Sequence, residues 1–508
     1  MSTPAPELRR LARGGSGNLA GLLFYGAASF FSVVIVTRSL GAREAGAFLI
    51  AVAAFSILVR TTQLGADIGM VRTVSGHLAL GRGGELSRVA RAALIPVALV
   101  SAVAGILVFA FAAPLAELLA GTAMAPTVRG CLRVVAVALP FAAVYQVLES
   151  TSRGYGTVRP SIVVEKVGRV SLQLAGIGAV TALGLGPVAV TAAWSVPWLI
   201  ALVALALWTR ALHRARAVGA VPAPNEDPNA AGSFWRFAAP RAPAATFQAG
   251  VMWSDTLILA ALTTTAEAGI YSTATRYMIV GSFAQLAVSQ TIQPIFGRLI
   301  ATDDLGAAEQ TYRSGSAWLV ALTWPMFLTA AIFAVPLLRV FGPAFVTADN
   351  ALVILSLGWL VATGCGPVDN LLLMAGRSGW TSLNAGVGLA LNIGLNLWLI
   401  PRYGIEGAAA AWAASLMWMN VAPLVQVRAS LHMSPFGPAW PIAFTGALGV
   451  FGGCLVASRV AVGETALGLA VGLVVAVGAY GAYLWALRRP LHLHTFAAGL
   501  QRRRKRPA

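Results

Sequence analysis

Charged residues are scarce in this sequence of 508 residues. Aspartate, glutamate, lysine and arginine make up 11% of the chain, whereas about a quarter is usual for a soluble protein. Hydrophobic residues make up 58%, and the mean hydropathy is +0.77. So little polar surface could not cover the core of a soluble protein of this size. The composition excludes a soluble fold and predicts an all-α polytopic membrane protein.

Groups that would carry enzymatic or metal chemistry are also missing. The three cysteines lie far apart, so they predict neither a disulfide framework nor a metal site. No Gly-Lys-Ser/Thr phosphate loop and no nucleophile–base arrangement occurs in the sequence, so we expect neither ATP-driven transport nor enzymatic activity from this chain. No cofactor is predicted, and proton or sodium coupling stays open. Only two lysines are present, Lys166 and Lys505, a bias typical of a GC-rich bacterial genome.

What the sequence does contain is a succession of apolar runs, each near the roughly 20 residues that a helix needs to cross a bilayer. We predict about 14 transmembrane helices, at 18–38, 45–68, 92–113, 130–149, 161–183, 187–209, 242–263, 268–296, 315–336, 350–374, 379–400, 407–428, 439–458 and 465–487. A polar, proline-rich stretch separates the sixth run from the seventh. The predicted organisation is a cytoplasmic segment 1–17, an N-lobe of six helices 18–209, a linker 210–239, a C-lobe of six helices 240–430, two additional helices 431–487 and a basic tail 488–508.

Basic residues are unevenly distributed between the two sides of this topology. With the N-terminus inside, 25 arginines and lysines fall in inside segments and 7 in outside segments, as the positive-inside rule requires. We therefore expect a bacterial cytoplasmic (inner) membrane protein with both termini cytoplasmic. The net charge of +18 is spread over the inside loops, which favours contact with the lipid bilayer and argues against nucleic acid as a partner.

A short motif occurs twice in the chain. Glu44-Ala45-Gly46 returns as Glu267-Ala268-Gly269, and the stretch ending at Trp194 resembles the one ending at Trp412. The two echoes share an offset of about 220 residues, which indicates a duplicated unit. Because each unit contains an even number of spans, the two six-helix repeats are parallel, an arrangement found in transporters.

Ionisable residues inside predicted spans are the candidates for substrate binding, because each costs about 2.5–3.5 kcal/mol at a helix centre. Arg60 lies deep in the second span and Arg276 in the eighth. A guanidinium in a protected cavity suits a phosphate or diphosphate through planar, bidentate hydrogen bonds. The alternative is that each arginine is neutralised by an acid and only holds helices together.

Other polar residues in the spans have two interpretations. Asp255 and Asp369 are either counter-ions to the arginines or proton or sodium sites for coupling. Asn392 and Asn396, on one face of the eleventh span, and Gln285, on the eighth, either line a sugar-binding cavity or hydrogen-bond neighbouring helices. The i,i+4 residues Glu165 and Arg169 are expected to satisfy each other.

Three stretches carry a resemblance to a known family: Asn18-Leu19-Ala20 and the following residues to Phe48, the run from Gln63 to Arg72, and Tyr403-Gly404-Ile405-Glu406-Gly407-Ala408-Ala409. They resemble the Wzx-type polysaccharide flippases of the multidrug/oligosaccharidyl-lipid/polysaccharide (MOP) exporter superfamily, over most of residues 18–430. The resemblance implies two six-helix lobes in a V shape and alternating access. It also implies transport of a polyprenyl-diphosphate-linked oligosaccharide to the outer leaflet, with polysaccharide polymerase and glycosyltransferases as partners.

The two added C-terminal spans resemble the lipid II flippase branch of this superfamily, in which cavity arginines on the second and eighth helices meet the diphosphate. Arg60 and Arg276 fill those places. The arginines that this branch has in its first helix are missing here, which argues against a peptidoglycan role. We therefore expect a lipid-linked oligosaccharide flippase. The alternatives are a cation-coupled multidrug exporter, a lipid II flippase, and a non-transporting scaffold of a polysaccharide assembly complex.

Overall fold

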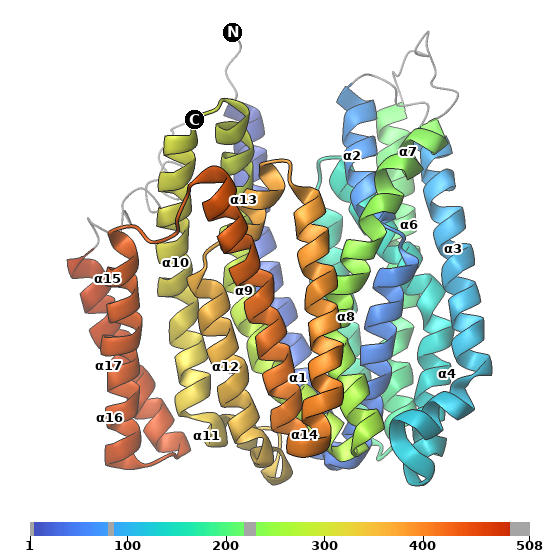
Figure 1. Ribbon diagram of the computed structural model, residues 1–508. Coiled ribbons are helices and arrows are strands. Elements are labelled where there is room, and N and C mark those ends of the chain that lie inside the picture. The colour runs from blue at the N-terminus through green and yellow to red at the C-terminus, as the bar shows by residue number, and fades with distance from the viewer. Residues whose placement is uncertain (1–4, 80–85, 218–229, 488–508) are drawn as a thin grey trace. The chain divides into compact units, whose positions relative to one another are not determined.

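The computed structural model describes residues 5–79, 86–217 and 230–487, and every regular element in these ranges is helical (Figure 1). Within them, nine helices are long and apolar enough to cross a membrane. Each predicted span falls mainly on helical residues. The prediction of an all-α polytopic membrane protein is confirmed. The centre of the predicted linker and the predicted basic tail lie outside the described residues.

Two glycines explain part of the difference between the number of long helices and the number of predicted spans. The helix α1 (Ala5–Thr62) holds the first two predicted spans and turns between them at Gly41, with φ 71° and ψ 178°. The helix α14 (Ser378–Leu431) likewise holds the eleventh and twelfth spans and turns at Gly404, with φ 53°. Residues with a side chain rarely adopt such positive φ values. Each of these helices is therefore a pair of antiparallel spans joined by one glycine.

The chain divides into two compact units, residues 1–269 and 270–508. In the first unit, α4 packs against α1, α2, α3 and α6, and its kink at Gly121 precedes the fourth predicted span. The core around it includes the aromatic rings of Phe55, Tyr145 and Trp198. The elements are α1, α2 (Ala66–Ala79), α3 (Leu86–Ala110), α4 (Ala112–Gly154), the π-helix η2 (Ser161–Arg169), α5 (Val170–Ala182), α6 (Pro187–Ala217), α7 (Ala230–Ala238), the 3-10 turn η3 (Ala239–Arg241), α8 (Ala242–Leu262) and the first turn of α9 (Thr265–Ala301).

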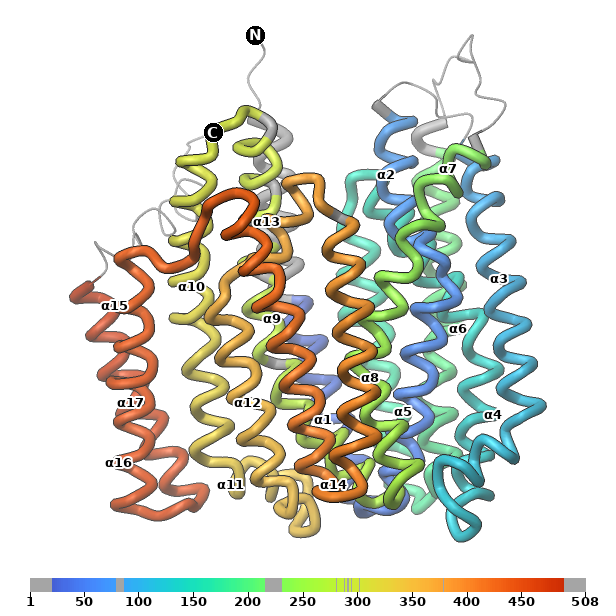
Figure 2. Tube along the Cα trace, viewed as in Figure 1, coloured from blue at the N-terminus to red at the C-terminus, as the bar shows by residue number. Residues whose placement is uncertain are grey.

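In the second unit, α10 packs against α12 and against the added C-terminal helices. The elements are the rest of α9, α10 (Leu305–Ile332), α11 (Ala334–Arg339), the 3-10 turn η4 (Pro343–Ala348), α12 (Asp349–Gly364), α13 (Val368–Met374), α14, α15 (Ala439–Thr445), the π-helix η5 (Gly446–Gly452), α16 (Gly453–Val462) and α17 (Ala466–Ala486). Figure 2 shows α16 and α17 side by side at one edge of this unit.

A polar clamp attaches these added helices to α10. Arg459 on α16 donates from Nη1 to the carbonyl of Ile332, 2.7 Å away, and from Nη2 to Oε2 of Glu464, 2.5 Å away. The other carboxylate oxygen of Glu464 accepts from the amide of Val335 at 3.2 Å. These bonds satisfy backbone groups where α10 ends, so the two additional spans are an integral part of the second unit.

The two glycines of the repeated motif meet each other. A Cβ atom at Gly46 would overlap the carbonyl oxygen of Thr265, and one at Gly269 would lie 2.7 Å from the carbonyl of Ala42 and 2.8 Å from Cα of Gly46. Only hydrogen fits at both positions, so the second arm of α1 and the first turn of α9 touch backbone to backbone. Small residues permit this kind of close helix approach within membranes.

Candidate functional site

A break in the second predicted span determines where Arg60 lies. The helix α1 ends at Thr62, and α2 begins at Ala66 after two residues with positive φ, Leu64 at 54° and Gly65 at 74°. Gly65 is required here for a second reason, because a Cβ atom would overlap the carbonyl oxygen of Ala238. The predicted second span, 45–68, is therefore interrupted, and Arg60 lies in the last turn of α1, beside the break.

Asp67 in the first turn of α2 is the acid that meets Arg60. Nη1 of Arg60 lies 3.6 Å from Oδ2 of Asp67, and the two side chains are 52% and 16% exposed. An exposed ion pair of this length contributes about 0–1 kcal/mol. A guanidinium carries five N–H donors in a planar fork, and one long contact leaves most of them able to bind an anion.

One acid on a helix of the first unit, Glu165, is paired inside the helix packing, in contrast to Arg60. On η2, Oε2 of Glu165 accepts a hydrogen bond from Nε of Arg169 at 3.0 Å, and Oε1 accepts another from Nη2 of the same arginine. The remaining Nη1 donates to Gln173 at 2.9 Å, and the guanidinium carbon lies 4.0 Å from the ring centroid of Trp198. Arg169 is 3% exposed. The predicted i,i+4 pair is confirmed, and it is a closed structural network.

Asp255 on α8 is also buried, with 1% of its surface exposed. Its Oδ1 accepts a hydrogen bond from the amide of Thr256 at 2.8 Å. Its predicted role as a counter-ion or coupling site stays a prediction, and the carboxylate that contacts Arg60 is Asp67, which carried no signal in the sequence.

The other predicted site residues belong to the second unit. Arg276 on α9 is half-buried, and its Nη2 donates to Oγ of Ser272 at 3.2 Å. Gln285 lies two and a half turns further along the same helix, so their Cα atoms project from opposite faces. Helix α9 alone therefore does not direct these two side chains to one place. Asp369 is half-buried in the first turn of α13, after the break at Gly366.

The predicted asparagine pair lies inside the packing of α14. Asn392 and Asn396 are both 0% exposed, and Nδ2 of Asn396 donates to Oδ1 of Asn392 at 3.1 Å. A second amide pair joins the two arms of the same helix, because Asn384 and Gln426 exchange reciprocal bonds of 2.8 and 2.9 Å. The Asn384–Gln426 pair is a bond between two arms of a helix, whereas the bond between Asn392 and Asn396 lies within one arm, so the role of these two asparagines stays a prediction.

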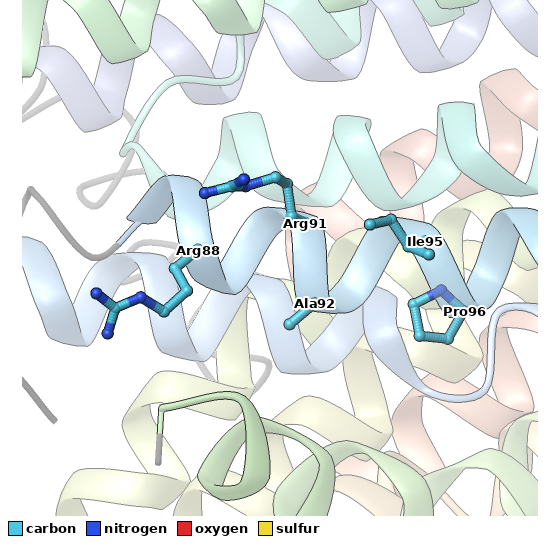
Figure 3. Close-up of a pocket in the computed structure, with 5 residues that line it drawn as sticks. All are labelled: Arg88, Arg91, Ala92, Ile95 and Pro96. Carbon is cyan, nitrogen blue, oxygen red and sulfur yellow. The ribbon is translucent and has the colours of Figure 1, made fainter. Parts of the chain in front are cut away.

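A shallow groove on α3 holds further positive charge. Arg88, Arg91, Ala92, Ile95 and Pro96 line it, and its volume is about 430 Å³ (Figure 3). None of the residues that the sequence assigned to substrate binding lines this groove. The groove is open and lies on the surface of one helix. The stronger candidate for a substrate-binding site remains the break between α1 and α2 that carries Arg60 and Asp67.

A segment of the first unit is similar to a known sequence family. Residues 20–176 match the family MatE. The probable flippase AglR of Haloferax volcanii is 27% identical over 182 residues, which are 35% of this chain and 37% of the relative. The probable low-salt glycan biosynthesis flippase Agl15 of the same organism is 26% identical over 164 residues, which are 32% of this chain and 35% of the relative. The chain thus matches little more than a third of either relative's length.

Two solved structures share the fold of nearly the whole chain. The lipid II flippase MurJ in an inward closed conformation has a TM-score of 0.71 at 12% identity, covering 92% of this chain and 99% of its own. An inward-facing multidrug resistance MATE family transporter of the MOP superfamily has a TM-score of 0.68 at 13% identity, covering 80% and 94%. At these identities the likeness establishes the fold alone.

Proposed function

We propose that this chain, a MOP superfamily protein with a MatE domain at residues 20–176, is a flippase for a polyprenyl-diphosphate-linked oligosaccharide. It moves this lipid from the inner to the outer leaflet of the bacterial cytoplasmic membrane by alternating access. Both relatives with matching sequence are named flippases, and one of them is named for glycan biosynthesis. These names agree with the proposal, and the matched segment lies in the part of the chain that carries Arg60.

The observation that carries the proposal is the difference in exposure between Arg60 and two acids of the first unit, Glu165 and Asp255. The guanidinium of Arg60 is half exposed at a helix break, whereas Glu165 is locked to a buried arginine and Asp255 is buried. An exporter of cationic drugs needs an accessible acid. An accessible arginine instead suits an anionic group such as a diphosphate.

In this proposal, Arg60 holds the diphosphate. It exchanges with Asp67 as the partner of Arg60, because the existing ion pair is long and exposed. The two N–H groups along one edge of the guanidinium then bind two phosphate oxygens in parallel. In the proposal, Arg276 on α9 is a further substrate-binding residue, the polar glycan follows the diphosphate, and the polyprenyl chain stays in the lipid. Polysaccharide polymerase and glycosyltransferases are the proposed protein partners, and proton or sodium coupling stays open.

Lipid analysis in cells tests this function. A strain that lacks the protein should accumulate an oligosaccharide on polyprenyl diphosphate, measured by mass spectrometry, and the wild-type copy should clear it. Arg60→Gln should leave the lipid in place. Arg43→Gln is the matched control, because Arg43 is exposed on the same arm of α1 at its other end, and this variant should clear the lipid.

An unchanged pool of polyprenyl-linked lipids in the deletion strain would refute the proposal. If that strain were instead more sensitive to cationic drugs, the multidrug exporter would replace the flippase as the function. If Arg43→Gln failed as completely as Arg60→Gln, the loss would reflect the charge of α1 in general, and the assignment of Arg60 to substrate would be wrong.

A further inference from the structure

Two arginines of the first unit share one aromatic ring. The guanidinium carbon of Arg72 on α2 lies 3.9 Å from the ring centroid of Phe237, and that of Arg241 in η3 lies 3.7 Å from the same centroid. The two guanidinium groups are therefore within about 8 Å of each other. Each is attracted to the electron-rich face of the ring, which holds two like charges together.

The local sequence fixes the position of this ring. Phe237 belongs to α7, whose neighbouring residue Phe234 is buried with Met70 and Val74 of α2. Trp235 anchors the same helix by donating from Nε1 to the carbonyl of Ala92 at 3.0 Å. Figures 1 and 2 show α7 beside α2 at one end of the first unit, the end that the topology predicts to be cytoplasmic.

Arg241 is held on the ring by a second contact. Its Nη1 donates to the carbonyl of Phe237 at 2.6 Å, so the turn from α7 into α8 sets the direction of its guanidinium. Arg72 is exposed and Arg241 is half-buried. Among the described residues, no carboxylate forms an ion pair with either arginine. Asp67, the one acid of α2, contacts Arg60 instead.

Such an arrangement favours an anion with more than one oxygen. Two guanidinium groups repel each other, and a ligand with negative charge relieves this repulsion when it binds both. A phosphate or diphosphate offers enough acceptor oxygens for two planar forks at once. Contact with the hydrophobic ring also keeps water from one side of each guanidinium, which strengthens the attraction to the ligand.

We propose that Arg72 and Arg241 form an entry site that binds the diphosphate of the lipid-linked substrate before it reaches Arg60. This inference rests on the proposed flippase function for the identity of its ligand. Asp67, the partner of Arg60, precedes Arg72 by five residues on α2, which corresponds to about 8 Å along the helix. A diphosphate that leaves the arginine pair therefore has a second arginine close by, because Asp67 in the first turn of this helix contacts Arg60 at the end of α1.

Binding to the purified full-length protein tests the site directly. The protein is placed in nanodiscs of phosphatidylcholine, so that no anionic lipid competes, and is titrated with geranylgeranyl diphosphate. We expect R72Q/R241Q to weaken this binding by about tenfold or more, and each single variant to weaken it less. Raised salt should weaken the wild type more than the double variant, because fewer charges take part in the variant.

The matched control is R402Q. Arg402 on α14 repeats the local geometry of Arg241, since its Nη1 donates to the carbonyl of Trp398 at 2.6 Å and its guanidinium carbon lies 5.2 Å from the Trp398 ring. It differs from Arg241 because, among the described residues, no second arginine contacts the same ring. R402Q should bind within about twofold of the wild type, and thermal unfolding of all variants checks that each is folded.

Competitors decide which source of phosphate the site takes. Geranylgeranyl monophosphate that binds clearly more weakly than the diphosphate supports the proposal. Inorganic pyrophosphate that binds as tightly as the lipid would assign the site to a free anion and overturn capture of the lipid. Equal loss in R402Q and R72Q/R241Q, or unchanged binding in R72Q/R241Q, would also overturn it.

A transport assay separates this site from the proposed function. If the wild type transports the lipid and R72Q/R241Q transports it more slowly only at low substrate concentration, the result supports an entry site. Transport that is unaffected at every concentration, together with unchanged binding, would refute the site and leave the flippase function standing. Diphosphate binding that depends on the arginine pair, in a protein that transports no lipid-linked glycan, would support the site and refute the function.

Discussion

Replacing Arg60 by glutamine separates a substrate-binding role from a structural one, because the ion pair that Arg60 now makes is weak. The pair with Asp67 is 3.6 Å long and half exposed, so its net contribution is about 0–1 kcal/mol. A charge-assisted bond to a diphosphate contributes about 1.5–3 kcal/mol. With about 0.5 kcal/mol taken for the lost pair, the exchange of Asp67 for substrate favours binding by about 1–2.5 kcal/mol, and Arg60→Gln should weaken binding by about 5- to 60-fold.

Asp67→Asn gives the opposite sign, which makes the prediction sharp. It releases Arg60 from its partner, so substrate binding should stay unchanged or strengthen by up to about fivefold. If the pair only held α1 to α2, both substitutions would act alike and would lower stability. The assay is the concentration dependence of transport into proteoliposomes, measured beside the thermal stability of each variant.

Two results would refute this reasoning. The first is an Arg60→Gln variant whose transport at low substrate matches that of Arg43→Gln within about twofold. The second is an Asp67→Asn variant that loses as much transport as Arg60→Gln. Either result would mean that the guanidinium of Arg60 does not exchange its carboxylate partner for a substrate anion.

Three further predictions concern the packing. Glu165→Gln should lower stability by about 3–5 kcal/mol, because it leaves the buried charge of Arg169 without its carboxylate partner. Glu149→Gln, which breaks a half-exposed pair, should lower stability by about 1 kcal/mol. Equal losses of stability in thermal unfolding would contradict this prediction. Gly46→Ala should destabilise by about 1–3 kcal/mol through overlap with the neighbouring backbone, and Gly76→Ala, which meets nothing within 4 Å, should not. Asn384→Ala should lower stability by about 0.6–1.7 kcal/mol, the range of hydrogen bonds between membrane helices, and a stability equal to the wild type would show that this amide bond contributes nothing.

The fold could be predicted from sequence because membrane length and apolar composition leave few alternatives. A run of about 20 apolar residues must form a helix in a bilayer, since no water satisfies the backbone there. Glycine and proline also mark breaks between elements, since α12 ends at Gly364, before Gly366 and Pro367, and η3 at 239–241 contains Pro240. The sequence did not reveal that α1 and α14 each contain two spans, because a single glycine suffices for the turn between them.

The candidate site was predicted less completely. Arg60 was singled out because a charge in an apolar run is costly, but its partner Asp67 lies beyond a break that composition alone does not reveal. Arg72 and Arg241 were attributed to the positive-inside bias, as loop arginines usually are. Their meeting on Phe237 depends on how α7 docks against α2, and no periodicity along the chain records such a contact between distant segments.

The most direct test of the flippase function uses the purified protein in vesicles that contain a fluorescent polyprenyl-diphosphate-linked oligosaccharide. A membrane-impermeant quencher reports how much of the glycan faces outward over time. We predict that wild-type protein brings the inward-facing pool into reach of the quencher, while vesicles without protein do not and Arg60→Gln does so several-fold more slowly. Wild-type vesicles that behave like empty vesicles, while a cationic dye is exported from them, would contradict the account.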